Sequence, residues 1–317
     1  MSKLGIKKNT RSNAITYLIV IVAFVLFTIL SNGGVLGRKT VGLLVPACCY
    51  IVMAISLNLT VGILGELSLG HAGFMSVGAF AGVVASTGLS STITSAPLRL
   101  AVAMVIGALF AAIAGFLIGI PVLRLRGDYL AIVTLAFGEI IKEIISCLIV
   151  GTDEKGLHIV FNYNGAKTVD DLGLTPTGTA IIKGAQGATG TQTIASFTAG
   201  FVLIMVALVI VLNFVNSRSG RAVMAIRDNR IAAESVGINI TKYKMIAFTI
   251  SAAIAGAAGA LYGLNYSNIT SAKFDFNTSI LILVFVVLGG LGNIRGSIIA
   301  AALLYVLPEL LRQFYDY

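Results

Sequence analysis

The sequence predicts an all-α protein that crosses a membrane repeatedly as a polytopic helical bundle, and three observations support this fold class. Hydrophobic residues make up 57% of the chain and charged residues 11%, with a mean hydropathy of +0.97, values far outside the globular range. Apolar runs recur along the whole chain, and about 20 apolar residues suffice for a helix to cross a bilayer. No stretch is left for a soluble domain, so we expect a single transmembrane domain over residues 1–317.

The apolar runs predict about eight to ten membrane segments. Two of the runs are short or interrupted by glycine, so breaks and re-entrant segments are expected as well. The candidate helices are residues 15–30, 41–59, 72–87, 98–120, 129–150, 193–215, 245–264, 279–291 and 296–311.

The distribution of Lys and Arg predicts the orientation, because positively charged short loops stay in the cytoplasm. With the N-terminus inside, 13 of the 22 Lys and Arg residues lie in the cytoplasm, 8 lie outside and 1 lies within a helix. This bias favours a cytoplasmic N-terminus. It also explains the net charge of +9 without nucleic acid, which would need a basic patch on a water-exposed domain.

Two loops are long and polar. The outer loop, residues 151–192, is rich in Gly and Thr. Its first part, 151–160, could cover the mouth of a pathway, and its second part, 183–192, has the composition of a flexible connector.

The inner loop, residues 216–244, contains a segment of helix-forming composition at 222–236. Val223, Ile226 and Ile231 are spaced as an apolar stripe, and Gly237 is placed to cap the C-terminus of the helix. Charged side chains occupy the rest of its surface, where Arg227 and Arg230 are expected at a solvated rim. The helix could lie on lipid, close against its own bundle or dock with a partner, and the residues alone support lipid contact and docking equally.

Glycines interrupt two apolar regions in a similar pattern. Gly62, Gly65 and Gly70 precede the run at 72–87, and Gly289 and Gly292 precede the run at 296–311. Several glycines within one or two turns weaken a helix and allow close backbone approach. Paired glycine breaks of this kind point to a translocation pathway built from internal repeats. The shared spacing covers only a few residues, so a chance similarity is the alternative.

Ionisable and polar residues near the membrane have two interpretations. Glu66 and Ser68 lie within the first break and His71 follows it, where they could line the pathway or simply mark a helix end or an interface. Glu139 and Lys142 are spaced as an i,i+3 pair, which favours a structural role. Asn58 and Thr134 could face a polar path, although back-bonding to helix carbonyls is the commoner role of Thr.

No catalytic or cofactor motif occurs. The chain lacks the GxxxxGK[ST] loop, HExxH and GxSxG, and the GLGNIRG stretch has the wrong spacing and context for a dinucleotide site. Cys48, Cys49 and Cys147 lie in apolar runs without a CxxC pair. We therefore expect no cofactor, no metal site and no enzymatic activity, so that any ATP is hydrolysed by another polypeptide.

Four stretches carry a resemblance to a known family. They are SLNLTVGILGELSLGHAGFMSVGAF, LRGDYLAIVTLAFGEII, GRAVMAIRDNRIAAESVGINITKYKMIAFTISAAIAGAAGALYG and LVFVVLGGLGNIRGSIIAAALLYVLPELL. In this order they resemble the M-type permease subunit of bacterial branched-chain amino acid ABC importers. The resemblance implies a type II importer permease in the bacterial inner membrane, with ATP-binding subunits, a second permease as heterodimer partner and an extracytoplasmic substrate-binding protein.

The resemblance also assigns the inner-loop helix to coupling with the ATPase. The coupling residues that it implies are Ala222, Ile226, Arg227, Asn229, Ala232, Ala233, Glu234 and Gly237. The implied cargo is leucine, isoleucine and valine, while urea, short amides and other amino acids are carried by similar systems. The alternative from another class is an ion-coupled secondary transporter in which Glu66, Glu139 or His71 titrates. Such a carrier has no need of a docking helix.

Overall fold

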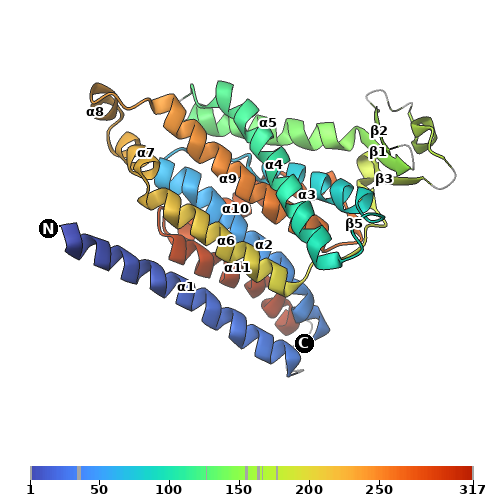
Figure 1. Ribbon diagram of the computed structural model, residues 1–317, viewed down its shortest axis with the longest axis horizontal. Coiled ribbons are helices and arrows are strands. Elements are labelled where there is room, and N and C mark those ends of the chain that lie inside the picture. Colours follow the sequence, from blue (N-terminus) through green and yellow to red (C-terminus); the bar gives the residue numbers. More distant parts are fainter. Residues whose placement is uncertain are drawn as a thin grey trace.

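The computed structural model describes residues 2–33, 37–125, 127–153, 156–162, 165, 167–175 and 178–315. These residues form a bundle of α-helices with a small sheet at one end (Figure 1). The α-helices are α1 (Ser2–Asn32), α2 (Arg38–Asn58), α3 (His71–Gly88), α4 (Ala96–Val122), α5 (Asp128–Ser146), α6 (Phe197–Asn216), α7 (Arg218–Asp228), α8 (Arg230–Ser235), α9 (Ile240–Gly263), α10 (Phe276–Gly289) and α11 (Ile294–Tyr315).

The polytopic helical bundle is confirmed, since each of the nine apolar runs overlaps one α-helix over most of its length. Among the described residues, six helical segments are long and apolar enough to cross a membrane, and the apolar part of α11, Ile294–Pro308, is shorter. The largest difference is at the first run, because α1 begins at Ser2 rather than near residue 15. The run at 129–150 is too long, because α5 ends at Ser146 and the chain then enters a strand at Leu148.

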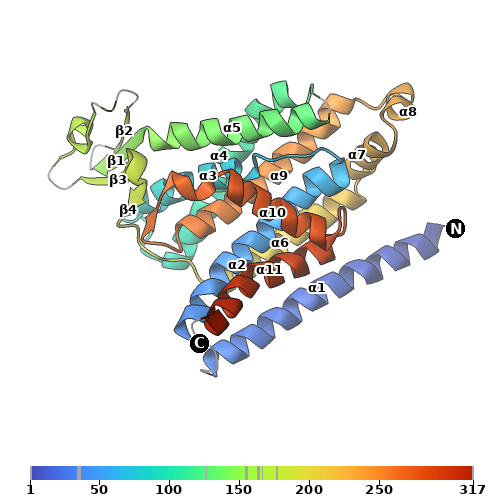
Figure 2. The ribbon, with the colours of Figure 1, turned by 180° about the vertical axis from the view of Figure 1, so that it is seen from behind.

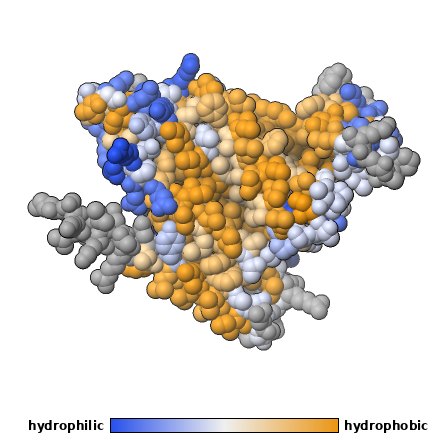
Figure 3. All heavy atoms as spheres, in the orientation of Figure 1, coloured by the Kyte–Doolittle hydropathy of each residue, from blue (hydrophilic) through white to orange (hydrophobic). Residues whose placement is uncertain are grey.

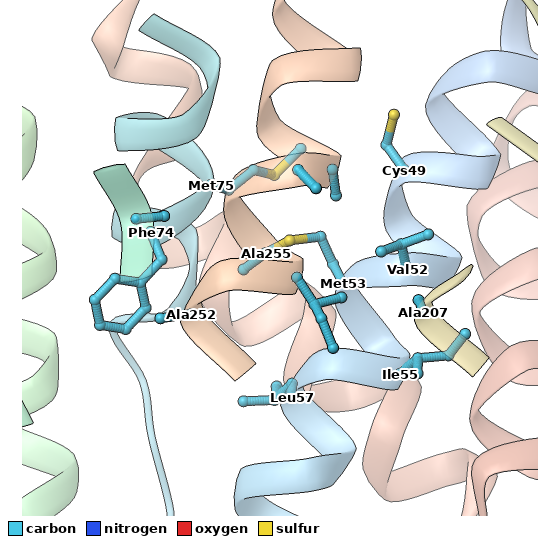
Figure 4. Close-up of a cluster of buried hydrophobic side chains, with 14 of the residues drawn as sticks. Cys49, Val52, Met53, Ile55, Leu57, Phe74, Met75, Ala207, Ala252 and Ala255 are labelled. Carbon is cyan, nitrogen blue, oxygen red and sulfur yellow. The ribbon is translucent and has the colours of Figure 1, made fainter. Parts of the chain in front are cut away.

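Two helices form the centre of the bundle. In the apolar windows of α2 and α9, 72% of the residues are buried by the protein itself, against 22% in α4 and 11% in α1. Figure 4 shows Met53 and Leu57 of α2 beside Ala252 and Ala255 of α9, with Phe74 and Met75 of α3 on the other side. The apolar surface left on the outer helices covers the middle of the molecule (Figure 3), as expected for contact with lipid.

Small residues let α3, α4 and α9 pack at backbone contact, and we call these three helices the packed block. A Cβ atom on Gly78 of α3 would lie 2.5 Å from the carbonyl carbon of Gly256 on α9. A Cβ atom on Gly256 would in turn lie 2.6 Å from the carbonyl oxygen of Gly107 on α4. The three helices therefore touch where none of them carries a side chain.

The outer loop takes part in a sheet that the sequence did not predict. Its antiparallel strands are β1 (Leu148–Asp153), β2 (Gly156–Phe161), β3 (Thr179–Lys183), β4 (Ala188–Thr189) and β5 (Asn268–Ile269), in the order β2-β1-β3-β4-β5. Residues 183–192 are therefore not a flexible connector, because Ala188 pairs with Ile182 and with Ile269. Short 3₁₀ turns at Val169–Leu172, Gly184–Gln186 and Ser271–Phe274 complete this region.

The two ends of the bundle differ in what they carry. The N-terminal end of α1 lies toward the same end of the molecule as α7 and α8, and the sheet lies at the opposite end (Figures 1 and 2). The end of α11 lies close to the start of α2, away from α7 and α8 (Figure 2). The inner loop and the outer loop of the sequence analysis are therefore well separated in the structure.

Candidate functional site

The first glycine break is present. The helix α2 continues as a π-helical turn, Leu59–Leu64, and stops at Gly65, which has a φ of +79°. The chain is then irregular until α3 begins at His71. Gly65 allows this stop because a left-handed conformation costs a residue without Cβ almost nothing.

The second glycine break lies directly against the first. The helix α10 ends at Gly289, and Gly292 has a φ of +81° just before α11 begins. A Cβ atom on Gly62 would overlap the backbone nitrogen of Gly292. The two breaks, far apart in the sequence, therefore share one contact in the structure.

Asn58 holds this contact from inside the bundle. Its Oδ1 accepts a hydrogen bond from the Gly292 backbone N–H at 2.8 Å, and its Nδ2 donates to Ser297 Oγ at 2.8 Å. Asn58 and Ser297 are both fully buried. We call Asn58, Gly62, Gly292 and Ser297 the glycine joint. Asn58 thus links α2 to α11.

The predicted helix at 222–236 is two helices. Asn229 is extended rather than helical, and its side chain accepts a hydrogen bond from the Ala232 backbone N–H at 3.0 Å, which caps α8. Such side-chain caps favour a new helix start over helix continuation. Gly237 ends α8 with a φ of +83°, which confirms its predicted capping position.

The break at Asn229 also divides the predicted apolar stripe. Val223 and Ile226 of α7 are buried, and Ile226 packs with Ala233 and Ile240 in a small cluster. Ile231 is instead 81% exposed, and Val236 is 75% exposed. Ala222 is half-buried, while Ala232 and Glu234 are exposed. The segment thus anchors itself with one set of apolar residues and presents another to its surroundings.

Arg227 is exposed, with 40% of its side-chain surface accessible, and its guanidinium also contacts its own chain. Its Nη1 donates to the Gly62 carbonyl oxygen at 2.8 Å. Its side-chain stem lies over Gly65, where an added Cβ atom would come within 2.6 Å of Arg227 Cγ. A further contact joins its guanidinium to Asp228 at 3.2 Å. The structure therefore brings a residue of the inner loop onto the first glycine break.

Glu66 pairs with a residue that the sequence analysis did not single out. The Lys244 ammonium on α9 donates to the Glu66 carboxylate, and the Lys244 side chain is buried. A buried charge needs such a partner, because its isolated transfer from water is costly. The two residues are 178 positions apart, so no local spacing could have indicated the pair.

The remaining residues of the first break face the interior of this chain. His71 is buried, and its Nε2 lies 2.5 Å from Ser56 Oγ. Ser68 is also buried, and Gly70 packs against the backbone of Thr134 on α5. In this conformation they hold α3 against its neighbours.

Glu139 and Lys142 form the predicted ion pair on α5. Glu143 is farther away, with 3.9 Å between its Oε1 and Lys142 Nζ. Glu139 Oε1 also accepts a hydrogen bond from the Phe276 backbone N–H at 3.2 Å, so the pair helps to position the start of α10. Thr134 donates to the Ala131 carbonyl at 2.8 Å, which is the back-bonding role.

A cavity of about 630 Å³ lies at the sheet end, between the end of α3 and strands β3 and β4. Its lining includes Ser86, Thr87, Lys183, Thr191 and Gln192. Gln192 Oε1 accepts a hydrogen bond from the buried Arg99 at 2.6 Å. Within the described ranges, no three His, Cys, Asp or Glu side chains gather as metal ligands.

The sequence profile of one protein family, described as the permease component of branched-chain amino acid transport systems, matches residues 39–317. This chain belongs to that family. It is 34% identical over 287 residues to the high-affinity branched-chain amino acid transport permease LivM of Escherichia coli (strain K12), and 35% identical over 289 residues to LivM of Salmonella typhimurium. Each match covers 89% of this chain but 65% of the relative, so the chain spans less than two thirds of those proteins.

A shorter match relates this permease-family chain to a second type of permease. LivH of Salmonella typhimurium, also named as a high-affinity branched-chain amino acid transport permease, is 34% identical over 108 residues, which is 34% of each chain. No solved structure matches the chain significantly. The M-type resemblance found in the sequence is confirmed by the family match and by both LivM relatives.

Proposed function

We propose that this chain is the membrane-spanning permease subunit of an ABC importer that carries leucine, isoleucine and valine across the bacterial cytoplasmic membrane. Family membership and the names of the LivM relatives support this cargo. ATP is hydrolysed by separate ATP-binding subunits, and an extracytoplasmic binding protein delivers the substrate. The LivH relative supports a second, similar permease as the other half of the pathway.

The observation that carries this proposal is the exposed apolar surface of α8. Ile231 and Val236 are 81% and 75% exposed at the end of the molecule where hydrophilic residues also gather (Figure 3). Large exposed apolar side chains rimmed by polar residues are typical of a surface that a protein partner covers. An ATPase groove that receives α8 buries both residues without disturbing the cluster of Ile226, Ala233 and Ile240 that holds the segment in place.

This assignment also orients the protein. A cytoplasmic ATPase reaches α8 only if that end faces the cytoplasm, which puts the N-terminus inside as well. The excess of Lys and Arg predicted for the inner loops supports the same orientation. The sheet and the cavity between α3, β3 and β4 then lie outside, where substrate arrives.

We further propose that the two glycine breaks belong to the translocation machinery as points where helices can shift. Gly62, Gly65, Gly70, Gly289 and Gly292 lie where helices end or where backbones touch. Ser68 and His71 are buried within the chain, so we assign them a structural role beside the break. Glu66 is half-buried and Gly65 is exposed. Alternating access requires such movable points because ATP binding must favour one arrangement over another.

The test places a carboxylate on α8. Ile231→Asp should reduce copurification of the ATPase at least tenfold, since an unpaired carboxylate buried at an interface costs several kcal/mol. The matched control is Thr241→Asp, which adds the same charge at an exposed position on α9. The measurement is ATPase recovered in mild detergent, together with leucine uptake into vesicles containing the full complex.

Two results would contradict the proposal. One is equal ATPase recovery for Ile231→Asp, Thr241→Asp and the wild type. The other is leucine uptake into vesicles that contain this chain alone, driven by an ion gradient and unchanged by Ile231→Asp, which would support the ion-coupled carrier instead. Uptake of urea or a short amide in preference to leucine would keep the ABC assignment and replace the cargo.

A further inference from the structure

Three distant parts of the chain meet at the Arg227 guanidinium. Arg227 belongs to α7, Gly62 to the last turn before the first break and Gly292 to the second break. The Nη1 atom bonds to the Gly62 carbonyl at 2.8 Å, and it would lie 3.8 Å from a Cβ atom on Gly292. Arg227 and Gly62 are separated by 165 positions in the sequence.

The contact with Arg227 pairs a backbone carbonyl group at the end of a helix. The last four carbonyl groups of a helix have no partner in the next turn, and Gly62 lies among them because the π-helical turn stops at Leu64. A cation is the favoured partner there, because the C-terminal end of a helix carries partial negative charge. Arg227 supplies this charge from another element.

The Arg227 side chain is oriented by contacts along its length, although 40% of its surface is accessible. Its stem covers Gly65, and Asp228 Oδ1 lies 3.3 Å from its Nε and 3.2 Å from its Nη2. Asp228 orients the planar guanidinium, and Nη1 donates one hydrogen bond to the Gly62 carbonyl, so a shift of α7 reaches that carbonyl through this bond.

The glycine joint passes this displacement on to the second break. Gly62 touches Gly292, and Asn58 accepts from the Gly292 N–H while donating to Ser297 of α11. A displacement at Gly62 is therefore shared by α2, α10 and α11.

We propose that Arg227 is the positioning residue that transmits movement of the α7–α8 segment to both glycine breaks. This inference rests on the proposed function, because it assumes that the segment docks with an ATPase. It differs from docking itself: Ile231 and Val236 face outward, whereas Arg227 Nη1 is turned onto its own chain. Loss of Arg227 should therefore leave assembly intact and weaken the link between ATP hydrolysis and transport.

The experiment uses the full complex in vesicles and compares Arg227→Met, Arg227→Lys and Arg221→Met. Methionine keeps an apolar stem over Gly65 but has no donor. Arg221 is the matched control, because its Nη1 also donates to a backbone carbonyl, that of Asn216 at 3.0 Å, which lies at the end of α6 and away from both breaks. The readouts are ATPase copurification, ATP hydrolysis and the number of ATP molecules hydrolysed per leucine imported.

For Arg227→Met we expect wild-type copurification and at least a fivefold increase in ATP hydrolysed per leucine. Arg227→Lys, which keeps one cationic donor, should give an intermediate ratio, and Arg221→Met should match the wild type. If Arg227→Met does not insert, the ratio for Arg227→Lys alone carries the test.

The inference is overturned if the ratio in the Arg227 variants equals that of Arg221→Met. It is also overturned if Arg227→Met abolishes copurification, because Arg227 would then contact the partner rather than its own chain. Neither result affects the proposed function. The proposed function fails separately, if no ATPase copurifies with the wild-type chain.

Discussion

In the packed block, glycines lie inside regular helices, whereas at the two glycine breaks they lie where helices stop. Gly78, Gly107 and Gly256 sit within α3, α4 and α9 and replace side chains that would hold these helices apart. Gly65 and Gly292 have positive φ values, and the backbone beside them is tied by side chains from other elements. The same residue type therefore makes one region rigid and leaves the other with a backbone that can be redirected.

The packed block and the glycine joint differ in how far they can move. Backbone contact between continuous helices allows little displacement, because close-packed interiors do not deform gradually. A helix end tied by three hydrogen bonds can change partner or direction without unpacking a core. The packed block is thus suited to move as one body, and the glycine joint is suited to be the place where it moves relative to α10 and α11.

The largest expected effect is in the packed block. Gly256→Val should destabilise the fold by about 3 kcal/mol, at the upper end of the usual cost of overpacking. Its Cβ atom would lie 2.6 Å from the Gly107 carbonyl oxygen, and neither backbone can retreat. The measurement is the yield and the melting temperature of the protein extracted in detergent.

The control for this substitution is Gly42→Val in α2, where an added Cβ atom meets nothing within 4 Å. Gly42→Val should melt close to the wild type. If Gly256→Val also melts close to the wild type, α4 and α9 are not held at backbone contact, and the packed block is not rigid.

A second effect, smaller in stability but large in activity, is expected at the glycine joint. Gly292→Val places a β-branched residue at a φ of +81°, which costs about 1–2 kcal/mol, although its Cβ atom meets nothing closer than the Gly62 carbonyl oxygen at 3.3 Å. The protein should insert and fold, while leucine uptake falls about tenfold because the second break cannot change direction. Leucine uptake per folded molecule is measured for Gly292→Val and for Gly42→Val. Equal uptake by the two variants would show that transport does not depend on the glycine joint.

The sequence predicts those features whose signals are local. Apolar runs place the helices, closely spaced glycines place the first break between Gly62 and His71, and Gly237 marks the end of α8. Each of these depends on neighbours within a few residues, so composition and spacing suffice.

What the sequence does not predict depends on long-range pairing. Nothing near Arg227 indicates that it reaches Gly62, and nothing near Glu66 indicates Lys244. The sheet is missed for the same reason, since Ala188 finds its partner at Ile269. The break at Asn229 is an exception: a capping residue inside a helical pattern is a local signal, and the helix-forming composition around it conceals it.

The smallest expected effect tests whether the glycine joint acts as a unit. Ser297→Ala removes the partner of Asn58 Nδ2 and leaves this buried donor without its hydrogen bond, at a cost of about 1 kcal/mol of unfolding free energy. Asn58→Ala should cost more, about 2 kcal/mol, because the Gly292 N–H also loses its acceptor.

Because Asn58 and Ser297 share one hydrogen bond, the double variant should be less destabilised than the sum of the two single variants, by about 1 kcal/mol. Denaturant unfolding of the detergent-solubilised protein measures all three differences. The matched comparison is the pair Asn58→Ala and Ser251→Ala, since Ser251 bonds to Thr60 and to the Ser56 carbonyl rather than to Asn58. Strict additivity in the Asn58–Ser297 cycle would mean that α2 and α11 are not joined through these side chains, and a displacement at Gly62 would then reach the second break only by backbone contact with Gly292.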